Sequence, residues 1–196
     1  LQPRYIFVTM SERAVLLINL GSPASTEVAD VRRYLDEFLM DERVLDAPYP
    51  VRWFVVKGLI LPRRPKESAE AYSKVWTQDG SPLIVYSEGQ RKMLDESTDV
   101  PVYLAMRYGE PAIGDTLTRM ASDGVKDAFV IPLYPHYAMS SYETVVARVE
   151  ELAPSSAPGM RVEFMPPFYN DPGYIDALYQ SAQEALADDA FDKLLF

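Results

Sequence analysis

Two adjacent arginines, Arg63 and Arg64, lie between two prolines in a segment that carries cations and no acid. From Ala47 to Lys66 the sequence has five basic residues, although the whole chain has 19 Lys and Arg against 29 Asp and Glu. The flanking prolines stiffen the backbone, and each guanidinium offers a planar fork of N–H donors that matches a carboxylate. The spacing therefore predicts a turn that binds carboxylate groups.

The same segment is rich in aliphatic and aromatic side chains, which run from Trp53 to Leu61. Apolar groups beside fixed cations suit a ligand or a surface that is both apolar and anionic. A buried helix whose Lys and Arg side chains reach the solvent explains the pattern equally well. The residues alone leave both interpretations open.

Polar and aromatic residues also follow two predicted strands. Arg107 and Tyr108 end one strand, and residues 134–142 follow the next. Parallel strands open a ligand-binding crevice at their carboxyl ends, so both groups are candidates for its walls. His136 is the sole histidine of the chain. A single histidine with no second one nearby is more often a hydrogen-bonded surface residue than a metal ligand.

The composition excludes several classes of protein. The chain has 196 residues, of which 48% are apolar, so it can bury a core and is not disordered. Because it has no cysteine, it has no disulfide and no Cys-ligated metal. The net charge of −10 argues against a nucleic-acid-binding protein, although a local basic patch stays open. The apolar runs are too short to cross a bilayer, so any membrane contact is peripheral.

Short apolar runs alternate with amphipathic stretches along the chain. We predict strands over residues 14–20, 100–108, 128–133, 161–165 and 194–196, and helices over residues 27–40, 66–76, 82–97, 112–122, 140–152 and 172–187, with a separate amphipathic piece over 48–64. This alternation predicts an α/β fold, a doubly wound parallel sheet with helices on both faces. The loop after the first strand, residues 19–23, has a single glycine, so a dinucleotide site is poorly supported.

The two ends suggest how the chain is divided. Residues 1–9 have no charged start or cleavage site typical of a secretory signal, so we interpret them as a non-native leader before Met10. Residues 154–159 form the best candidate boundary between an N-terminal domain over residues 10–153 and the beginning of a second, similar domain over 160–196. The apolar end at Phe196 indicates the front portion of a longer protein.

Taken together, several motifs in order resemble the ferrochelatase family, whose members insert ferrous iron into a porphyrin. The resemblance runs from about Ala14 to the last residue. It depends on the segments AVLLINLGSP, LPRRP, DGSPL, AMRYGEP, GVKDAFVIPLYPHYAMSSYETV and PPFYNDPGYI. It implies a chelatase-like fold, with protoporphyrin IX and ferrous iron as substrates and protohaem as product, in the last step of haem biosynthesis. It implies no prosthetic group, and a cytoplasmic protein that touches a membrane through the segment from Trp53 to Leu61.

The resemblance also assigns site residues. Arg63, Arg64, Tyr72 and Ser81 would contact the propionates of the porphyrin, and Arg107 and Tyr108 would line the pocket. The remaining substrate-binding candidates are Leu20, Leu35, Leu39, Tyr137 and Tyr169. Family members that use coproporphyrin tend to carry Tyr at the position of Leu20, so the leucine favours protoporphyrin IX.

The catalytic His and Glu of the family are expected beyond Phe196, so no catalytic residue is assigned in this chain. The isolated 196 residues are then expected to hold a porphyrin without turning over. His136 would make an outer, transient iron contact at most. Two alternatives stay open: a non-catalytic porphyrin-binding module, and a chelatase for cobalt or nickel. The oligomeric state is open as well.

Overall fold

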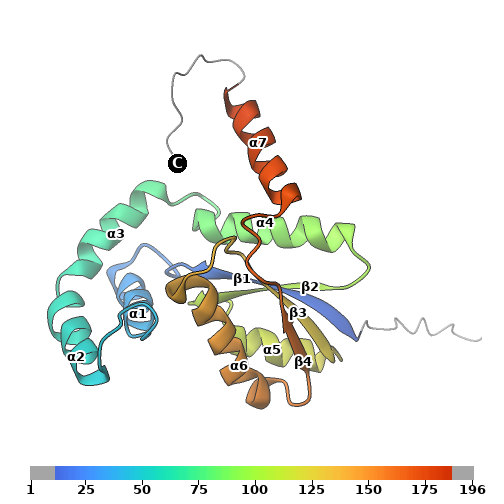
Figure 1. Cartoon of the computed structure of the whole chain (residues 1–196). Helices are drawn as coiled ribbons and strands as arrows, with labels where there is room; N and C mark the ends of the chain where they lie inside the picture. The colour runs from blue at the N-terminus through green and yellow to red at the C-terminus, as the bar shows by residue number, and fades with distance from the viewer. Residues whose placement is uncertain (1–11, 187–196) are drawn as a thin grey trace, which may run out of the picture.

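The apolar run predicted as the first strand forms β1 (Arg13–Gly21), an inner strand of a parallel sheet (Figure 1). A computed structural model describes residues 12–186, and within them the strand order is β2-β1-β3-β4. The neighbours of β1 are β2 (Val102–Tyr108) and β3 (Asp127–Pro132), while β4 (Arg161–Phe164) pairs with β3. All of these pairings are parallel, as the alternation of elements predicts.

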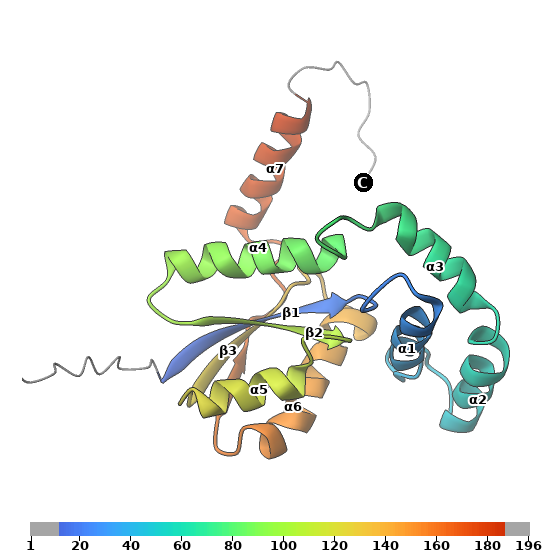
Figure 2. The same cartoon turned by 180° about the vertical axis from the view of Figure 1, so that it is seen from behind.

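Successive residues of β1 point to opposite faces of the sheet. Leu16 and Ile18 pack with α5 (Ile113–Ser122) and α6 (Thr144–Ser156), whereas Leu17 lies in a second cluster with residues of α4 (Pro82–Ser97). Figures 1 and 2 show α4 on one side of the sheet and α5 with α6 on the other. The prediction of a parallel sheet covered on both faces is confirmed.

The remaining helices lie to one side of the sheet or stand away from it. They are α1 (Val28–Leu39), α2 (Tyr49–Trp53), the π-helical η1 (Phe54–Ile60), α3 (Arg64–Val75), the short π-helical η2 (Met139–Glu143) and α7 (Pro172–Leu186). In both views α1, α2 and α3 gather beyond the carboxyl ends of the strands, and α7 projects away from the sheet. None of the helices within residues 12–186 is long and apolar enough to cross a membrane.

The structure corrects the start of one predicted loop. The loop expected over residues 154–159 begins later, because α6 continues through Pro154 to Ser156 and the N–H of Ala157 still bonds to the carbonyl of Ala153 at 2.9 Å. Pro154 cannot donate a helical hydrogen bond, yet the last turn of α6 forms after it. β4, at the start of the predicted second domain, is hydrogen-bonded to β3 in the same sheet, and the division of the chain into two domains stays a prediction. The predicted leader over residues 1–9 and the strand over 194–196 lie outside the described residues.

Gly21 ends β1 at a point where two backbones approach closely. Its φ is +103°, and a Cβ placed there would lie 1.8 Å from the carbonyl oxygen of Tyr108, its register partner on β2. Its own carbonyl accepts a hydrogen bond from the Tyr34 hydroxyl at 3.2 Å. Glycine is therefore required both by its left-handed backbone and by the lack of space.

We expect Gly21→Ala to lower the free energy of unfolding by about 3 kcal/mol, because the methyl group must push β1 away from β2 in an unfavourable backbone conformation. Gly89 offers a matched control, since it lies inside α4 and a Cβ there would meet no atom within 4 Å. Gly89→Ala should stabilise the protein by about 1 kcal/mol, because alanine is the better helix former. Thermal unfolding of both variants checks this, and equal melting temperatures would contradict it.

Candidate functional site

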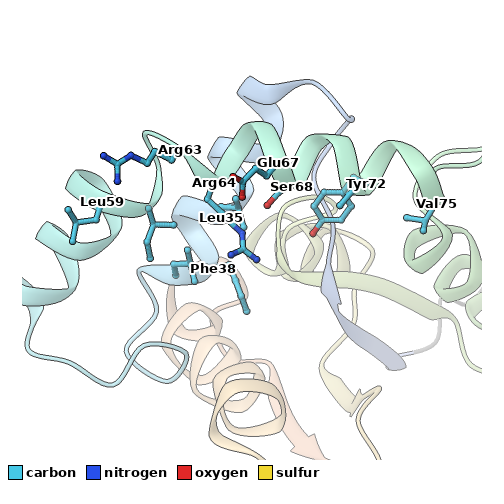
Figure 3. A pocket seen from close by; sticks show the side chains of 12 residues that line it. Leu35, Phe38, Leu59, Arg63, Arg64, Glu67, Ser68, Tyr72 and Val75 are labelled. Carbon is cyan, nitrogen blue, oxygen red and sulfur yellow. The ribbon is translucent and has the colours of Figure 1, made fainter. Parts of the chain in front are cut away.

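A groove of about 750 Å³ lies between α1, η1 and α3, a volume within the usual range for small-molecule sites. Figure 3 shows its side chains, which come from these three elements and from Arg63, the residue before α3. Most are apolar, and the charged ones come from the N-terminal turn of α3 and the residue before it. The lining consists of Leu35, Phe38, Leu39, Leu59, Ile60, Arg63, Arg64, Glu67, Ser68, Ala71, Tyr72 and Val75.

The helical period explains why α3 presents this face. Its lining residues lie at positions 64, 67, 68, 71, 72 and 75, three or four residues apart, and such positions share one side of an α-helix. Charged and polar groups occupy the start of this stripe, and Ala71, Tyr72 and Val75 occupy its end. The groove therefore has a polar end and an apolar end.

The two arginines at the polar end are exposed and lack protein partners. Within residues 12–186, neither guanidinium makes a hydrogen bond or an ion pair. Figure 3 shows Arg64 pointing toward Leu35 and Phe38, while Arg63 extends to the side of Leu59. Two cations with free donors on a groove wall are available to an anionic ligand.

Other cations of the same segment serve the fold instead. Arg52 is buried, and its guanidinium donates to the carbonyl of Ala47 at 2.8 Å. Lys57 pairs with Asp36 on α1. The basic run that the sequence displays thus divides into structural cations on α2 and η1 and free cations beside the groove.

An aromatic cluster supports the groove from behind. The ring of Tyr34 meets the ring of Tyr72 edge-on at 6.4 Å and stacks against Phe38 at 6.1 Å, and Tyr108 meets Phe38 edge-on at 5.2 Å. Burial raises the pKa of the Tyr34, Tyr72 and Tyr108 hydroxyls above the ordinary value. These phenols therefore stay protonated at neutral pH and do not serve as bases.

A buried carboxylate joins three elements beneath this cluster. Asp41 follows α1, and its Oδ2 accepts hydrogen bonds from the Arg107 guanidinium, the Tyr108 hydroxyl at 2.9 Å and the Thr144 hydroxyl. The side chain of Asp41 is 5% exposed and that of Arg107 is 11% exposed. Burial alone would raise the pKa of Asp41, but the hydrogen bonds from Thr144, the Arg43 backbone and Tyr108, together with the Arg107 charge, hold it below the ordinary value.

The structure does not place Arg107 and Tyr108 in the groove lining, where the resemblance would put them. Tyr108 is fully buried, and Arg107 also donates to Thr144, with Nε 2.7 Å from the hydroxyl. Because their polar ends are occupied by Asp41 and Thr144, they lie behind the groove wall and are absent from its lining. Their role as substrate-binding residues stays a prediction.

The structure gathers five of the predicted site residues in the groove: Leu35, Leu39, Arg63, Arg64 and Tyr72. Leu20 and Ser81 are outside its lining, Leu20 at the end of β1 and Ser81, which is buried, at the N-terminus of α4.

The predicted residues that follow β3 and β4 form a separate group outside the groove lining. The Tyr137 hydroxyl donates to Glu143, and the ring of His136 stacks on Tyr169 with centroids 5.3 Å apart. Within residues 12–186 no three His, Asp or Glu side chains are grouped so that they could hold a metal ion. The iron contact assigned to His136 stays a prediction.

Sequence reasoning missed several lining residues. Leu59 and Ile60 lie in the apolar segment from Trp53 to Leu61, in which no single residue was assigned to the site, and Phe38 lies in the predicted first helix. The residues missed on α3 are Glu67, Ser68, Ala71 and Val75. The helical period counted from Arg64 would have found them, because it places all four on the face of that arginine and Tyr72.

The family model and the relatives that match most of the chain point to the same family. The Ferrochelatase family model matches residues 12–196. A ferrochelatase from Opitutus terrae is 54% identical over 173 residues, which are 87% of this chain and 50% of that protein. A ferrochelatase from Ectopseudomonas mendocina is 49% identical over 187 residues, 95% of this chain and 54% of its own. The chain belongs to the ferrochelatase family, and it spans about half the length of these relatives.

Among solved structures, a putative cobalamin (vitamin B12) biosynthesis CbiX protein from Marinobacter aquaeolei VT8 aligns with 90% of this chain and 99% of its own. The TM-score is 0.46 and the sequence identity is 16%.

We expect Asp41→Asn to lower the free energy of unfolding by about 3 kcal/mol at neutral pH, because it leaves the buried Arg107 charge uncompensated. The pKa of Asp41 is lowered in the folded protein, so its contribution is present above the ordinary carboxyl value and lost as the pH falls through the folded one. The difference between wild type and variant should therefore shrink below about pH 4. Urea unfolding over a pH series measures it.

Asp36→Asn is the matched control, since Asp36 pairs with Lys57 and both side chains are about one-third exposed, at 32% and 36%. It should cost less than about 1 kcal/mol. A cost for Asp41→Asn that is equally small, or that does not change with pH, would contradict the assignment of a buried, charged carboxylate.

Proposed function

We propose that this chain is the porphyrin-binding part of an enzyme that inserts ferrous iron into protoporphyrin IX and forms protohaem, in the last step of haem biosynthesis. The observation that carries the proposal is the groove itself, an apolar slot with two unpaired guanidiniums at one end. Its support from relatives is the ferrochelatase name of proteins that match most of the chain.

The chemistry of the ligand suits these walls. A porphyrin is a flat apolar disc that carries propionates along one edge. The aliphatic side chains and the ring of Tyr72 would contact the macrocycle, and Arg63 and Arg64 would bind the propionates as charge-assisted hydrogen-bond donors. The proposed reaction needs no prosthetic group, and ferrous iron enters as a substrate.

In this proposal the groove also distorts the porphyrin ring. Metal insertion must expose the pyrrole nitrogens, whose lone pairs lie in the plane of a flat macrocycle. A pocket that holds the propionates and presses on the rim can bend the ring, and the binding energy of these remote groups then favours the reactive geometry. The pyrrole protons would pass to the His and Glu that the family carries beyond the position of Phe196.

Leu20 bears on which porphyrin is used. It gives no hydroxyl at a position where members that use coproporphyrin tend to carry Tyr, and we propose protoporphyrin IX on that ground. A leucine side chain has no oxygen atom that could bind the iron, whereas a tyrosine has one.

We expect Arg63→Ala and Arg64→Ala, in the protein at its natural length, to raise the dissociation constant for protoporphyrin roughly tenfold each, because each removes a charge-assisted hydrogen bond. Arg64→Lys should restore only part of the affinity, since an ammonium lacks the planar fork. Titration of porphyrin absorbance gives the constants, and iron insertion measured in the same assay should show a raised KM.

Lys74→Ala is the control for these variants, because Lys74 lies on α3 and is exposed but absent from the groove lining. It removes one positive charge from the helix that carries Arg64 and should leave porphyrin affinity unchanged. If the arginine variants bind as tightly as wild type, the propionate assignment is wrong. If the wild-type protein binds no porphyrin, the proposed function is wrong.

We further propose that α2 and η1 touch a membrane from the cytoplasmic side, where a poorly soluble porphyrin is exchanged. Tyr49, Val51, Trp53 and Phe54 are each at least 48% exposed, although all are apolar or aromatic. Leu59, exposed by 50%, also lines the groove, so the exposed surface adjoins the opening. Figure 1 shows α2 at the outer edge of the molecule. Aromatic side chains beside cations suit a lipid headgroup region.

We expect the double variant Trp53→Ser, Phe54→Ser to bind vesicles of phosphatidylglycerol and phosphatidylcholine roughly tenfold more weakly than wild type, because two aromatic side chains no longer enter the lipid. Tyr86→Ser, which changes a residue 73% exposed on α4, is the control and should bind as wild type does. Vesicle co-sedimentation measures both. If both variants lose vesicle affinity equally, the binding is nonspecific and the proposed contact through α2 and η1 is wrong.

A further inference from the structure

A second pocket, of about 460 Å³, is formed by the segment between α1 and α2, by α2 itself and by η2. It has no lining residue in common with the groove. Tyr49 and Arg52 of α2 line it, and Tyr49 is 62% exposed. The pocket therefore shares a side chain with the exposed aromatic surface of α2 and η1.

Arg52 is a buried cation without a counterion. It is 7% exposed, and within residues 12–186 its guanidinium forms no ion pair. A guanidinium has several N–H donors, but Arg52 makes one hydrogen bond, to the carbonyl of Ala47 at 2.8 Å, and its buried Nε has no partner. The ring of Tyr49 lies 5.9 Å away. Because a buried charge without a partner is costly, this guanidinium is suited to an anion that enters the pocket.

The other charges of the pocket are mostly acidic. Arg43 pairs with Glu143 at 3.4 Å and with Glu42 at 3.6 Å, so two carboxylates share its charge. Asp46 is exposed, and its carboxylate makes no ion pair or hydrogen bond within the part of the chain that the structure describes. A simple anion would be attracted by Arg52 and repelled by these acids. A ligand that carries an anionic and a cationic group matches both.

We propose that this pocket binds the headgroup of phosphatidylethanolamine, which joins a phosphate to a primary ammonium. The phosphate would accept charge-assisted hydrogen bonds from Arg52, and the ammonium would donate to the carboxylates of Asp46 and Glu42. A membrane lipid is favoured over a soluble molecule because Tyr49 and Trp53, which are exposed on the same helix as Arg52, can contact its acyl chains. The inference depends on the membrane contact proposed above.

The elements that form the pocket correspond to the parts of this lipid. The phosphate of phosphatidylethanolamine lies between the acyl chains and the ammonium. Helix α2 carries both the exposed aromatic side chains and Arg52, whereas the acids come from the segment before α2 and from η2. Phosphatidylcholine has the same charges, but its trimethylated nitrogen has no N–H to donate to a carboxylate. The pocket should therefore prefer ethanolamine to choline.

The experiment uses the protein at its natural length and compares vesicles of phosphatidylcholine with vesicles of phosphatidylcholine and phosphatidylethanolamine in equal amounts. We expect wild type to bind the mixed vesicles roughly fivefold more tightly. Asp46→Asn keeps the size of the side chain and removes its charge, so the ratio of the two dissociation constants should fall close to one. Because Asp46 is exposed, this variant is expected to fold. Vesicle co-sedimentation gives the constants.

Asp99→Asn is the matched control, because Asp99 is an exposed acid between α4 and β2 and lies outside the lining of this pocket. It makes the same change in net charge and should keep the preference of wild type. Arg52→Met should weaken binding to both kinds of vesicle roughly fivefold, since both lipids carry the phosphate. Circular dichroism verifies that each variant is folded.

If Asp46→Asn keeps the preference for mixed vesicles, the preference comes from lipid packing, and the inference is wrong while the membrane contact stands. An equal loss in Asp99→Asn would overturn it as well, since the effect would then come from net charge. Glycerophosphoethanolamine has the same headgroup without acyl chains, and equally tight binding of this soluble molecule would overturn the assignment to a lipid. Failure of wild type to bind either kind of vesicle would overturn the membrane contact together with this inference, and the porphyrin titrations would be unaffected.

Discussion

The groove depends on the buried carboxylate of Asp41. This side chain follows α1, the helix that gives one wall of the groove, and it binds Arg107 on β2 and Thr144 at the start of α6. A buried charge without its partner is costly. The packing of the end of α1 against β2 and α6 is therefore expected to be cooperative. Because α3 packs on α1, the position of the second wall follows from that of the first. The contacts that hold α1 in place at Asp41 thus lie outside the groove lining.

The charged side chains of the groove lining differ from the buried Asp41–Arg107 pair. Its charged side chains are exposed and have no protein partner within residues 12–186, whereas the cations and anions behind it are paired. Exposed charges keep their hydration, so leaving them unpaired costs the fold little. The same donors become valuable when an apolar ligand with carboxylates displaces that water. If the groove binds a ligand as proposed, stability and binding are carried by different charges, which can be altered independently.

Most of the fold could be predicted from the sequence, because a continuous apolar run such as that of β1 has few alternatives to a buried parallel strand. The arginines of the groove were also predictable, since two cations between prolines form a local pattern. What could not be predicted depends on distant contacts. The burial of Arg107 requires Asp41, 66 residues away, and Thr144, 37 residues away. The position of β4 in the first sheet depends likewise on its register with β3. No local pattern encodes such pairings.

The ionisable groups in and behind the groove wall are not suited to accept protons from a ligand. Burial keeps the Tyr34, Tyr72 and Tyr108 hydroxyls protonated by raising the pKa of each. Asp41 is ionised, but its Oδ2 accepts three hydrogen bonds, and its lowered pKa makes it a poor proton acceptor. Deprotonation of a pyrrole therefore needs a base other than these four. The described groups of this region are therefore assigned to the shape of the groove and not to proton transfer.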